Sequence, residues 1–289
     1  MPAKKIKEKP QVTIIGTGRL GTALAVALEA KGYPIQSLVA RRLQSARKAA
    51  AVLEDKPRAY AANQIGVLPQ ADLFLITVPD DQIAKVAAQL GSQNYDPKPT
   101  VLHTSGALSS EVLSPLRAKG WSTGSVHPLI SVSDPNTSIE GAFWSVEGDA
   151  HAVRVGKTLV RDLGGTSFSI RTADKPLYHA AAVMTSGNVT ALFDVALEML
   201  VECGLTRTTA RRILQPLLVS TVHNLETKDP AAALTGTFSR GEVETVKRHL
   251  AALKDHKLAE ALELYCRLGR RSIKLTKKRT GITRILDGC

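Results

Sequence analysis

Short apolar runs rich in β-branched residues alternate with helix-forming segments along the first 170 residues. This alternation is typical of a parallel sheet that is covered by helices on both faces. Turn-forming residues stand between most of the runs, as in Pro79-Asp80-Asp81. The predicted strands are residues 12–15, 35–40, 73–78, 100–103, 122–126, 143–146 and 166–170.

From about residue 171 onward, the apolar positions follow the 3.6-residue period of helices. The sequence therefore predicts a doubly wound, mostly parallel α/β domain in residues 1–170 and an all-α domain in residues 171–289. A length of 289 residues fits two domains of this size. The segment 233–241, between two helices, is expected to be a loop. The predicted helices are residues 173–202, 206–226, 229–235, 241–254 and 256–278.

A glycine-rich turn follows the first predicted strand. Gly16, Gly18 and Gly21 have the spacing GxGxxG, between an apolar run and a helix-forming segment. In such turns the first glycine permits a tight bend, the second lets the backbone approach a pyrophosphate, and the third lets the helix pack on its strand. The helix N-terminus then offers free N–H groups to the anion. This pattern predicts a Rossmann domain that binds a dinucleotide through Gly16, Thr17, Gly18, Arg19, Leu20 and Gly21.

The end of the second predicted strand indicates which dinucleotide binds. A site for NAD(H) carries an acidic residue about 20 residues after the glycine turn, but residues 36–45 contain none. Arg41 and Arg42 stand there instead, and guanidinium groups bind phosphate oxygens in a bidentate manner. A solvated helix start is the alternative interpretation of these arginines. We therefore predict NADP(H), with contacts from Arg41, Arg42, Ser45, Val78 and Pro79.

Side chains that can transfer a proton stand where other strands end. His103 and His127 each end a predicted strand, and ligands of open α/β sheets bind beyond the carboxyl ends of the strands. Lys175 and His179 share one face of a predicted helix, where the helix dipole disfavours the charged lysine. Such groups protonate a carbonyl or imine as hydride arrives, and a structural role for each is the alternative. The predicted proton donors are His103, His127, Lys175 and His179, and the predicted substrate contacts include Ser105, Gly106 and Ser186.

The net charge of +12 lies mostly at the two ends of the chain. Residues 1–10 carry +3 and residues 267–289 carry +7, so +2 remains for the body between them. Nucleic-acid binding is one interpretation of the basic tail, but residues 267–289 contain no aromatic residue on which a base could stack. A solvated helix end is the simpler explanation.

The cysteines and the apolar runs restrict the class of protein further. Cys203, Cys266 and Cys289 are odd in number and widely spaced, so we expect neither a disulfide framework nor a CxxC metal site. No apolar run approaches the ~18 residues that a membrane span needs. These features favour a protein of the cytoplasm that does not embed in a membrane.

Six motifs along the chain together resemble a bacterial family that joins a Rossmann-like domain to a C-terminal domain of unknown function. More distantly, the chain is similar to pyrroline-5-carboxylate reductase, ketopantoate reductase and the deazaflavin-dependent NADP oxidoreductases. The resemblance covers about residues 11–275. The motifs are GTGRLG, LITVPDDQI, LHTSGALSS, GSVHPL, KPLYHAAAVMTSGNVTALF and ALTGTFSRGEVETVKRHLAAL.

This resemblance implies a nucleotide-binding N-terminal domain and a helical C-terminal domain like that of 6-phosphogluconate dehydrogenase, through which two copies form a homodimer. In the wider β-hydroxyacid dehydrogenase group a lysine is followed four residues later by asparagine, and the matching positions here are Lys175 and His179. Arg240 lies in the last motif, where it either reaches an anionic substrate from the partner subunit or caps a helix.

The sequence as a whole predicts an NADP(H)-dependent oxidoreductase that reduces a small keto or imine substrate. One alternative is a redox sensor that binds NADP(H) without turnover. A further alternative is a protein that binds nucleic acid through its basic tail.

Overall fold

The computed structural model of the chain describes residues 9–276 and 281–288. Most of the basic N-terminal segment, Cys289 and residues 277–280 of the basic tail lie outside the described residues. The chain divides into two compact units, residues 1–184 (unit 1) and residues 185–289 (unit 2).

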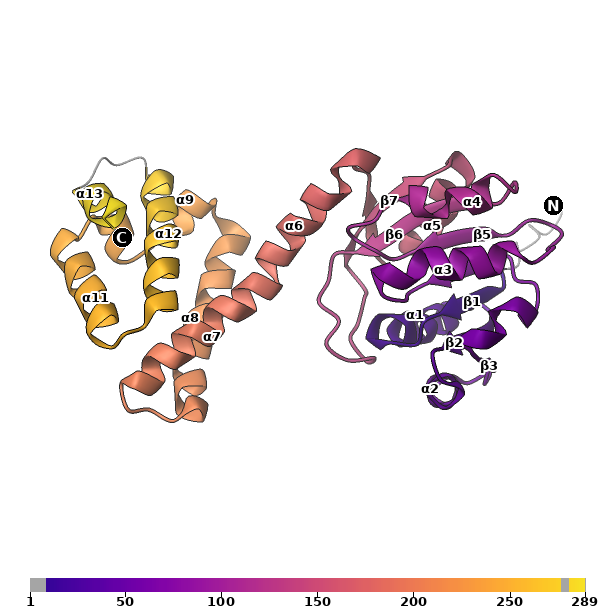
Figure 1. Cartoon of the computed structure of the whole chain (residues 1–289), viewed down its shortest axis with the longest axis horizontal. Helices are drawn as coiled ribbons and strands as arrows, with labels where there is room; N and C mark the ends of the chain where they lie inside the picture. The colour runs from indigo at the N-terminus through magenta and orange to yellow at the C-terminus, as the bar shows by residue number, and fades with distance from the viewer. Residues whose placement is uncertain (1–8, 277–280, 289) are drawn as a thin grey trace, which may run out of the picture. The chain divides into compact units, whose positions relative to one another are not determined.

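Unit 1 is built on an eight-stranded sheet in the order β3-β2-β1-β4-β5-β6-β7-β8 (Figure 1). All neighbouring strands in it are parallel except β6 and β7, which are antiparallel. The predicted doubly wound, mostly parallel sheet is therefore confirmed. The strands are β1 (Val12–Ile15), β2 (Ile35–Ala40), β3 (Arg58–Ala61), β4 (Leu73–Ile76), β5 (Thr100–His103), β6 (Ser122–Pro128), β7 (Phe143–Gly148) and β8 (Thr166–Phe168).

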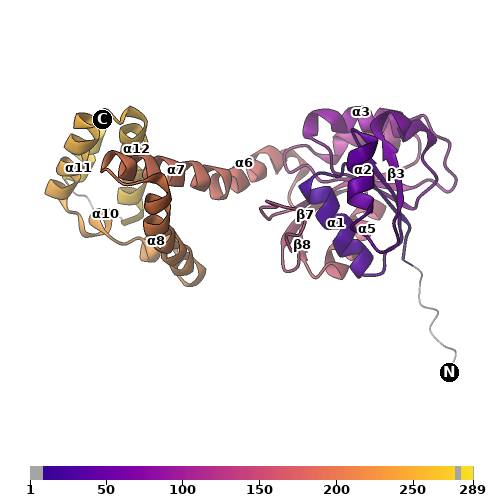
Figure 2. The same cartoon turned by 90° about the horizontal axis from the view of Figure 1, so that it is seen from below.

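Helices cover both faces of this sheet (Figure 2). Alternate residues of the central strands enter two separate cores: Leu75 packs in the core that includes residues of α1 and α5, and Phe74 packs in the core that includes residues of α3. The strands therefore bury both faces, which explains their uninterrupted apolar runs. The helices of unit 1 are α1 (Arg19–Ala30), α2 (Leu43–Ala50), α3 (Asp80–Gly91), α4 (Ser114–Arg117), α5 (Ala150–Asp162) and α6 (Lys175–Thr185), with 3₁₀ turns at Ala62–Val67, Ser110–Leu113 and Thr172–Asp174.

Unit 2 is helical, as predicted. Its core is formed by apolar residues of α11, α12 and α13, among them Val246, Ile273 and Leu286. The helices are α7 (Gly187–Glu202), α8 (Arg207–Thr227), α9 (Pro230–Ala233), α10 (Thr237–Arg240), α11 (Val243–Asp255), α12 (Ala259–Thr276) and α13 (Ile282–Asp287).

Three local predictions need correction. The predicted single helix of residues 173–202 is two helices, because a turn at Ser186, with φ −114° and ψ −75°, separates α6 from α7. The segment 233–241 is not entirely loop, since it contains the one-turn helix α10. Strand β3 was missed because its sequence, RAYA, holds two alanines and forms a partly exposed edge of the sheet.

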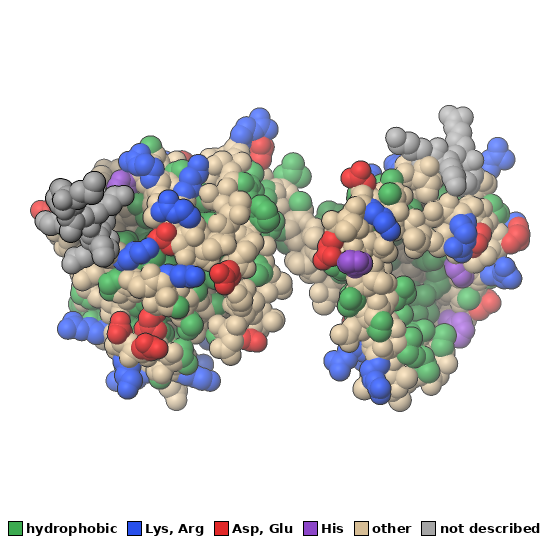
Figure 3. All heavy atoms as spheres, turned by 180° about the vertical axis from the view of Figure 1, so that it is seen from behind, with side chains coloured by type: hydrophobic (Ala, Val, Ile, Leu, Met, Phe, Trp, Pro, Cys, Tyr) green, Lys and Arg blue, Asp and Glu red, His purple; other side chains and the backbone are tan. Residues whose placement is uncertain are grey.

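Much of the apolar surface of unit 2 is exposed in the single chain (Figure 3). By length and composition alone, the helical stretch Thr172–Glu202 is apolar enough to cross a membrane, since an 18-residue window in it has a mean hydropathy of 1.4. Its first turns, however, pack on the sheet of unit 1, where Lys175 is fully buried. The large exposed apolar side chains of α7 and α8 are Leu192, Val201, Ile213, Leu217, Val219, Val222 and Leu225.

Candidate functional site

The glycine-rich turn connects β1 to α1 in a tight arrangement. Gly16 has a φ of +116°, which favours glycine. A Cβ on Gly21 would lie 1.8 Å from the carbonyl oxygen of Gly16, so the third glycine of the motif is required for this packing. The Thr77 hydroxyl, just after β4, donates a hydrogen bond of 2.5 Å to the same carbonyl oxygen. The turn is thus fixed from the neighbouring strand.

A cavity of about 730 Å³ opens beyond the carboxyl ends of β1, β2 and β4. A Cβ on Gly18 would meet no atom within 4 Å, so the backbone at this position stands open to a ligand. Arg19, Leu20 and Gly21 lie in the first turn of α1 and are not among the residues that line the cavity. The predicted cofactor-binding residues that do line it are Gly16, Thr17, Gly18, Arg41, Arg42, Ser45, Val78 and Pro79.

The cavity is positively charged at the end of β2. Arg41 and Arg42 line it there, and Lys85 of α3 lines it from another side, against one acidic residue, Asp81. Within the described residues neither Arg41 nor Arg42 forms an ion pair with a carboxylate. Both guanidinium groups are exposed and remain available to an anion.

Alanine substitutions at two glycines separate the fold of this turn from its contact with a ligand. Gly18→Ala is expected to leave the free energy of unfolding within about 0.5 kcal/mol and to weaken NADPH binding roughly tenfold or more, because its methyl group fills the approach to the pyrophosphate. Gly21→Ala is expected to cost about 2 kcal/mol of stability, because its methyl group overlaps the Gly16 carbonyl. Chemical unfolding and cofactor titration measure the two effects. Unchanged NADPH affinity in Gly18→Ala would contradict the proposed approach of the cofactor.

A row of polar side chains crosses the sheet at β5, β6 and β7, next to the ends of the strands that form the cavity. His103 of β5 pairs in register with Ser125 of β6, and Ser125 pairs with Glu147 of β7. One step further along, His127 of β6 pairs with Ser145 of β7. Because alternate residues of a strand share a face, these side chains lie on one face of the sheet.

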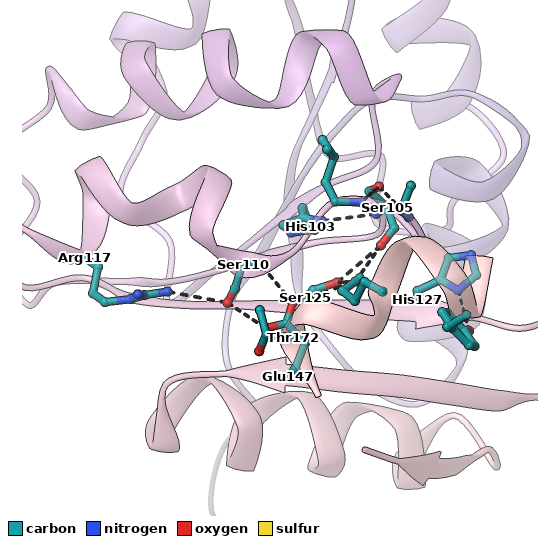
Figure 4. A network of polar contacts seen from close by, with 12 residues as sticks. His103, Ser105, Ser110, Arg117, Ser125, His127, Glu147 and Thr172 are labelled. Atoms are coloured by element: carbon teal, nitrogen blue, oxygen red, sulfur yellow. Dashed lines mark hydrogen bonds and ion pairs between the residues drawn. The ribbon is translucent and has the colours of Figure 1, made fainter. Parts of the chain in front are cut away.

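His103, Ser125 and Glu147 of this row are shown in Figure 4. Lys175, the first residue of α6, extends onto the row. Its Nζ donates hydrogen bonds to the Ser105 carbonyl oxygen at 2.9 Å and to the Ser125 hydroxyl at 2.5 Å, and lies 3.8 Å from Oε1 of Glu147. The side chain is fully buried. Burial lowers the pKa of Lys175 to about 8, although the nearby Glu147 and Asp80 carboxylates oppose this shift.

Glu147 holds several parts of unit 1 together. Its carboxylate accepts hydrogen bonds from the backbone N–H and the hydroxyl of Ser110, both at 2.7 Å, and from the Thr172 hydroxyl at 3.4 Å. The buried carboxylate thus has partners from two segments: Ser110 in the segment after β5, and Thr172 and Lys175 at the start of α6.

The two strand-end histidines are in different environments. His103 is fully buried, and its Nδ1 accepts a hydrogen bond of 3.2 Å from the Ser105 N–H, which holds the loop after β5. His127 is half-buried, and its Nδ1 lies 2.7 Å from the Tyr178 hydroxyl. Burial and the charge of Lys175 lower the pKa of His103 to about 3 and that of His127 to about 4, so both rings are neutral at pH 7.

His179 and Gly106 complete the cluster around His127. The His179 ring lies edge-on to the His127 ring, with centroids 5.9 Å apart. A Cβ on Gly106 would lie 2.5 Å from Cδ2 of His179 and 2.7 Å from Nε2 of His127, so any larger residue here would displace the two rings. The structure therefore brings His103, Ser105, Gly106, His127, Lys175 and His179 together, all within unit 1.

Two predicted substrate contacts lie in unit 2, outside this cluster. Ser186 forms the turn between α6 and α7, where its carbonyl oxygen accepts from the N–H of Thr190. Arg240, the last residue of α10, is exposed and forms an ion pair with Glu242 at 2.5 Å. Their substrate contacts stay predictions.

The sequence analysis did not predict three residues of the cluster: Ser125, Glu147 and Tyr178. Two of them carried a signal, since Ser125 alternates with His127 in one strand and Glu147 alternates with Ser145 in the next. That pattern indicates two neighbouring strands with one polar face each. Tyr178 directly precedes His179, but nothing in the sequence indicated that it turns toward His127.

Comparisons with known proteins agree with this architecture. The chain is similar to the solved structure of a proposed NADP oxidoreductase from Bacteroides fragilis, with 22% identity, a TM-score of 0.76, and coverage of 92% of this chain and 99% of that chain. It is also similar to a pyrroline-5-carboxylate reductase from Coxiella burnetii, with 17% identity, a TM-score of 0.58, and coverage of 93% of this chain and 100% of that chain. A third similar structure is a reductive aminase from Aspergillus terreus in complex with NADPH and ethyl-5-oxohexanoate, with 17% identity, a TM-score of 0.66, and coverage of 97% of this chain and 99% of that chain. Likeness at these identities shows a shared fold. Comparison with curated proteins gives no match.

Two family profiles match successive parts of the sequence. Residues 3–128 match a Rossmann-like domain and residues 142–272 match a domain of unknown function, DUF2520. Together these matches confirm the resemblance that the motifs indicated. The chain thus joins a Rossmann-like domain to a DUF2520 domain.

Proposed function

We propose that this protein is an NADP(H)-dependent oxidoreductase that reduces a small keto or imine compound by hydride transfer. The proposal rests mainly on the presence of two sites on the same sheet. The cavity with the glycine turn and the arginine pair lies at the carboxyl ends of β1, β2 and β4, and the buried acid–base cluster lies on β5 to β7. Ligands of open α/β sheets bind at this edge.

The residues of the cavity fit NADP(H). The open backbone at Gly18 and the N-terminus of α1 suit a pyrophosphate, and the unpaired Arg41 and Arg42 suit the 2′-phosphate. The names of two structural relatives point the same way, since one is a proposed NADP oxidoreductase and the other was solved in complex with NADPH. When bound, NADPH supplies the hydride.

The cluster on β5 to β7 supplies acid–base chemistry. Hydride addition to a C=O or C=N bond leaves negative charge on the oxygen or nitrogen, which a neighbouring group must neutralise by giving a proton. His127 and His179 are candidate donors, whereas the fully buried Lys175 contributes a positive charge that favours the developing anion. His103 is better suited to hold the loop of Ser105 and Gly106, because its ring is fully buried.

Titration of the purified protein with NADPH and with NADH, followed by nicotinamide fluorescence, tests the proposal first. We expect NADPH to bind at least about tenfold more tightly than NADH, through the added phosphate contacts. The complex is then screened against 2-keto acids and cyclic imines for oxidation of NADPH. Tight binding without turnover would favour a redox sensor, and no binding of either nucleotide would contradict the assignment of the cavity.

The proposal includes a homodimer formed through the helices of unit 2. The exposed apolar side chains of α7 and α8 support it, because a large apolar patch on a protein surface marks a site of association. A second copy of this chain offers an equally apolar surface, as a two-fold interface requires.

A further inference from the structure

A proton donor must touch the substrate, and this requirement divides the cluster into sealed and accessible groups. Lys175 and His103 are 0% exposed and Glu147 is 6% exposed. Every one of them is held by neighbours: Nζ of Lys175 by Ser105 and Ser125, the His103 ring by Ser105, and Glu147 by Ser110. Direct contact of these groups with a substrate would break the hydrogen bonds that fix the loop.

His127 and Tyr178, in contrast, are both half-buried and are joined to each other. The Tyr178 hydroxyl lies 2.7 Å from Nδ1 of His127, and Phe168 packs edge-on against the Tyr178 ring with centroids 5.8 Å apart. The other ring nitrogen of His127, Nε2, lies 2.7 Å from the position that a Cβ on Gly106 would occupy. Nδ1 of His127 is thus occupied by the Tyr178 hydroxyl, which also has Ser145 as a partner, so the hydroxyl is the acidic group of the pair.

We propose that Tyr178 is the catalytic proton donor of the reductase reaction and that His127 is the residue that positions its hydroxyl. This inference rests on the proposed function. As hydride adds to the carbonyl or imine carbon, the C=O or C=N π electrons move to the oxygen or nitrogen, which takes the phenolic proton. The resulting phenolate accepts the N–H hydrogen bond of neutral His127 and is reprotonated from solvent before the next turnover.

The charged groups around the pair support this direction of proton transfer. Lys175 and His179 face it from α6, His103 lies on β5, Glu147 lies on β7, and Asp80 of α3 acts on Lys175. Burial and, second to it, the positive charge of Lys175 lower the pKa of His127 and keep its ring neutral. Burial raises the pKa of Tyr178, although a hydrogen bond with Ser145 opposes this shift, so the hydroxyl holds its proton until the substrate takes it.

The substitution Tyr178→Phe tests the assignment, with Tyr95→Phe as a matched control. The Tyr95 hydroxyl bonds the Leu68 carbonyl, away from the cluster, so its loss leaves kcat within about twofold. With a compound that the wild-type enzyme reduces, we expect Tyr178→Phe to lower kcat by about 10² to 10³-fold and to leave the Kd for NADPH within about twofold. His127→Asn, which keeps a polar partner for the hydroxyl, is expected to retain more activity than His127→Leu.

Two readouts separate a failed assignment from a failed proposed function. Wild-type turnover that survives in Tyr178→Phe contradicts the role of Tyr178 and leaves the reductase intact, whereas NADPH binding with no wild-type turnover contradicts both. The second readout needs no substrate: in protein labelled with ¹⁵N-histidine, Tyr178→Phe is expected to shift the Nδ1 resonance of His127. An unchanged resonance would show that the pair does not form and would overturn the proposal.

Discussion

Replacing Arg41 and Arg42 together by glutamate is expected to weaken NADPH binding by about 100-fold or more and to change NADH binding by less than about threefold. The 2′-phosphate loses two charge-assisted partners, each worth about 1.5–3 kcal/mol, and two carboxylates then repel it. Since about 1.4 kcal/mol corresponds to a tenfold change in affinity, even the lower figure for both contacts gives about 100-fold. Fluorescence titration with each nucleotide measures the two affinities.

A matched control for this variant places the same change of charge at the amino ends of the strands, opposite the carboxyl ends where the cavity lies. Lys31 precedes β2 and Lys98 precedes β5, so both lie at the amino ends of the strands. Both side chains are exposed. The double variant Lys31→Glu, Lys98→Glu is expected to leave both nucleotide affinities within about twofold, because exposed charges beyond a Debye length of about 8 Å are largely screened. Equal losses for NADPH and NADH in the arginine variant would contradict a 2′-phosphate site.

The second large effect concerns stability. Glu147→Gln is expected to lower the free energy of unfolding at pH 7 by about 3 kcal/mol, because it leaves the charge of Lys175 buried without its carboxylate. Lys175→Met is expected to cost less, since Glu147 keeps three hydrogen bonds from Ser110 and Thr172. In the double variant the costs should be less than additive by about 1 kcal/mol or more. Urea unfolding of the four proteins measures this cycle, and strict additivity would show that the pair does not interact.

The same proteins carry a pH signature of Lys175. Its pKa is about 8 in the folded chain, against an ordinary value of 10.5, so between these pH values the unfolded chain binds more protons. The free energy of unfolding of the wild type, relative to Lys175→Met, is therefore expected to rise between pH 8 and pH 10.5. At about 1.4 kcal/mol per pKa unit the rise is roughly 3 kcal/mol. A difference that stays flat across this range would mean that Lys175 is not buried as a charged group.

The sheet and the cofactor cavity were largely predictable because local sequence determines them. The run VTII needs no information beyond its own residues to form a buried strand, and the spacing from Gly16 to Gly21 fixes the turn that follows. Arg41 and Arg42 line the cavity because they directly follow Ala40, the residue at which β2 ends.

The acid–base cluster was less predictable because it depends on contacts between distant segments. Lys175 lies 70 residues from Ser105 and 50 from Ser125, and no local pattern indicates that these segments meet. Tyr178 and His127 are 51 residues apart, and the register of the antiparallel pair β6 and β7 decides that Glu147 faces Ser125. Helix periodicity likewise predicted one helix over residues 173–202, whereas the turn at Ser186 divides it into two.

The division of the two sites between different strands has an evolutionary consequence. The cavity draws its predicted cofactor contacts from β1, β2 and β4, while the proton chemistry draws on β5, β6, β7 and the start of α6. Substitutions in well-separated groups of residues add independently. Under the proposed function, a descendant of this protein can therefore exchange one nucleotide for another by altering two arginines and keep its proton chemistry, or alter that chemistry and keep its nucleotide.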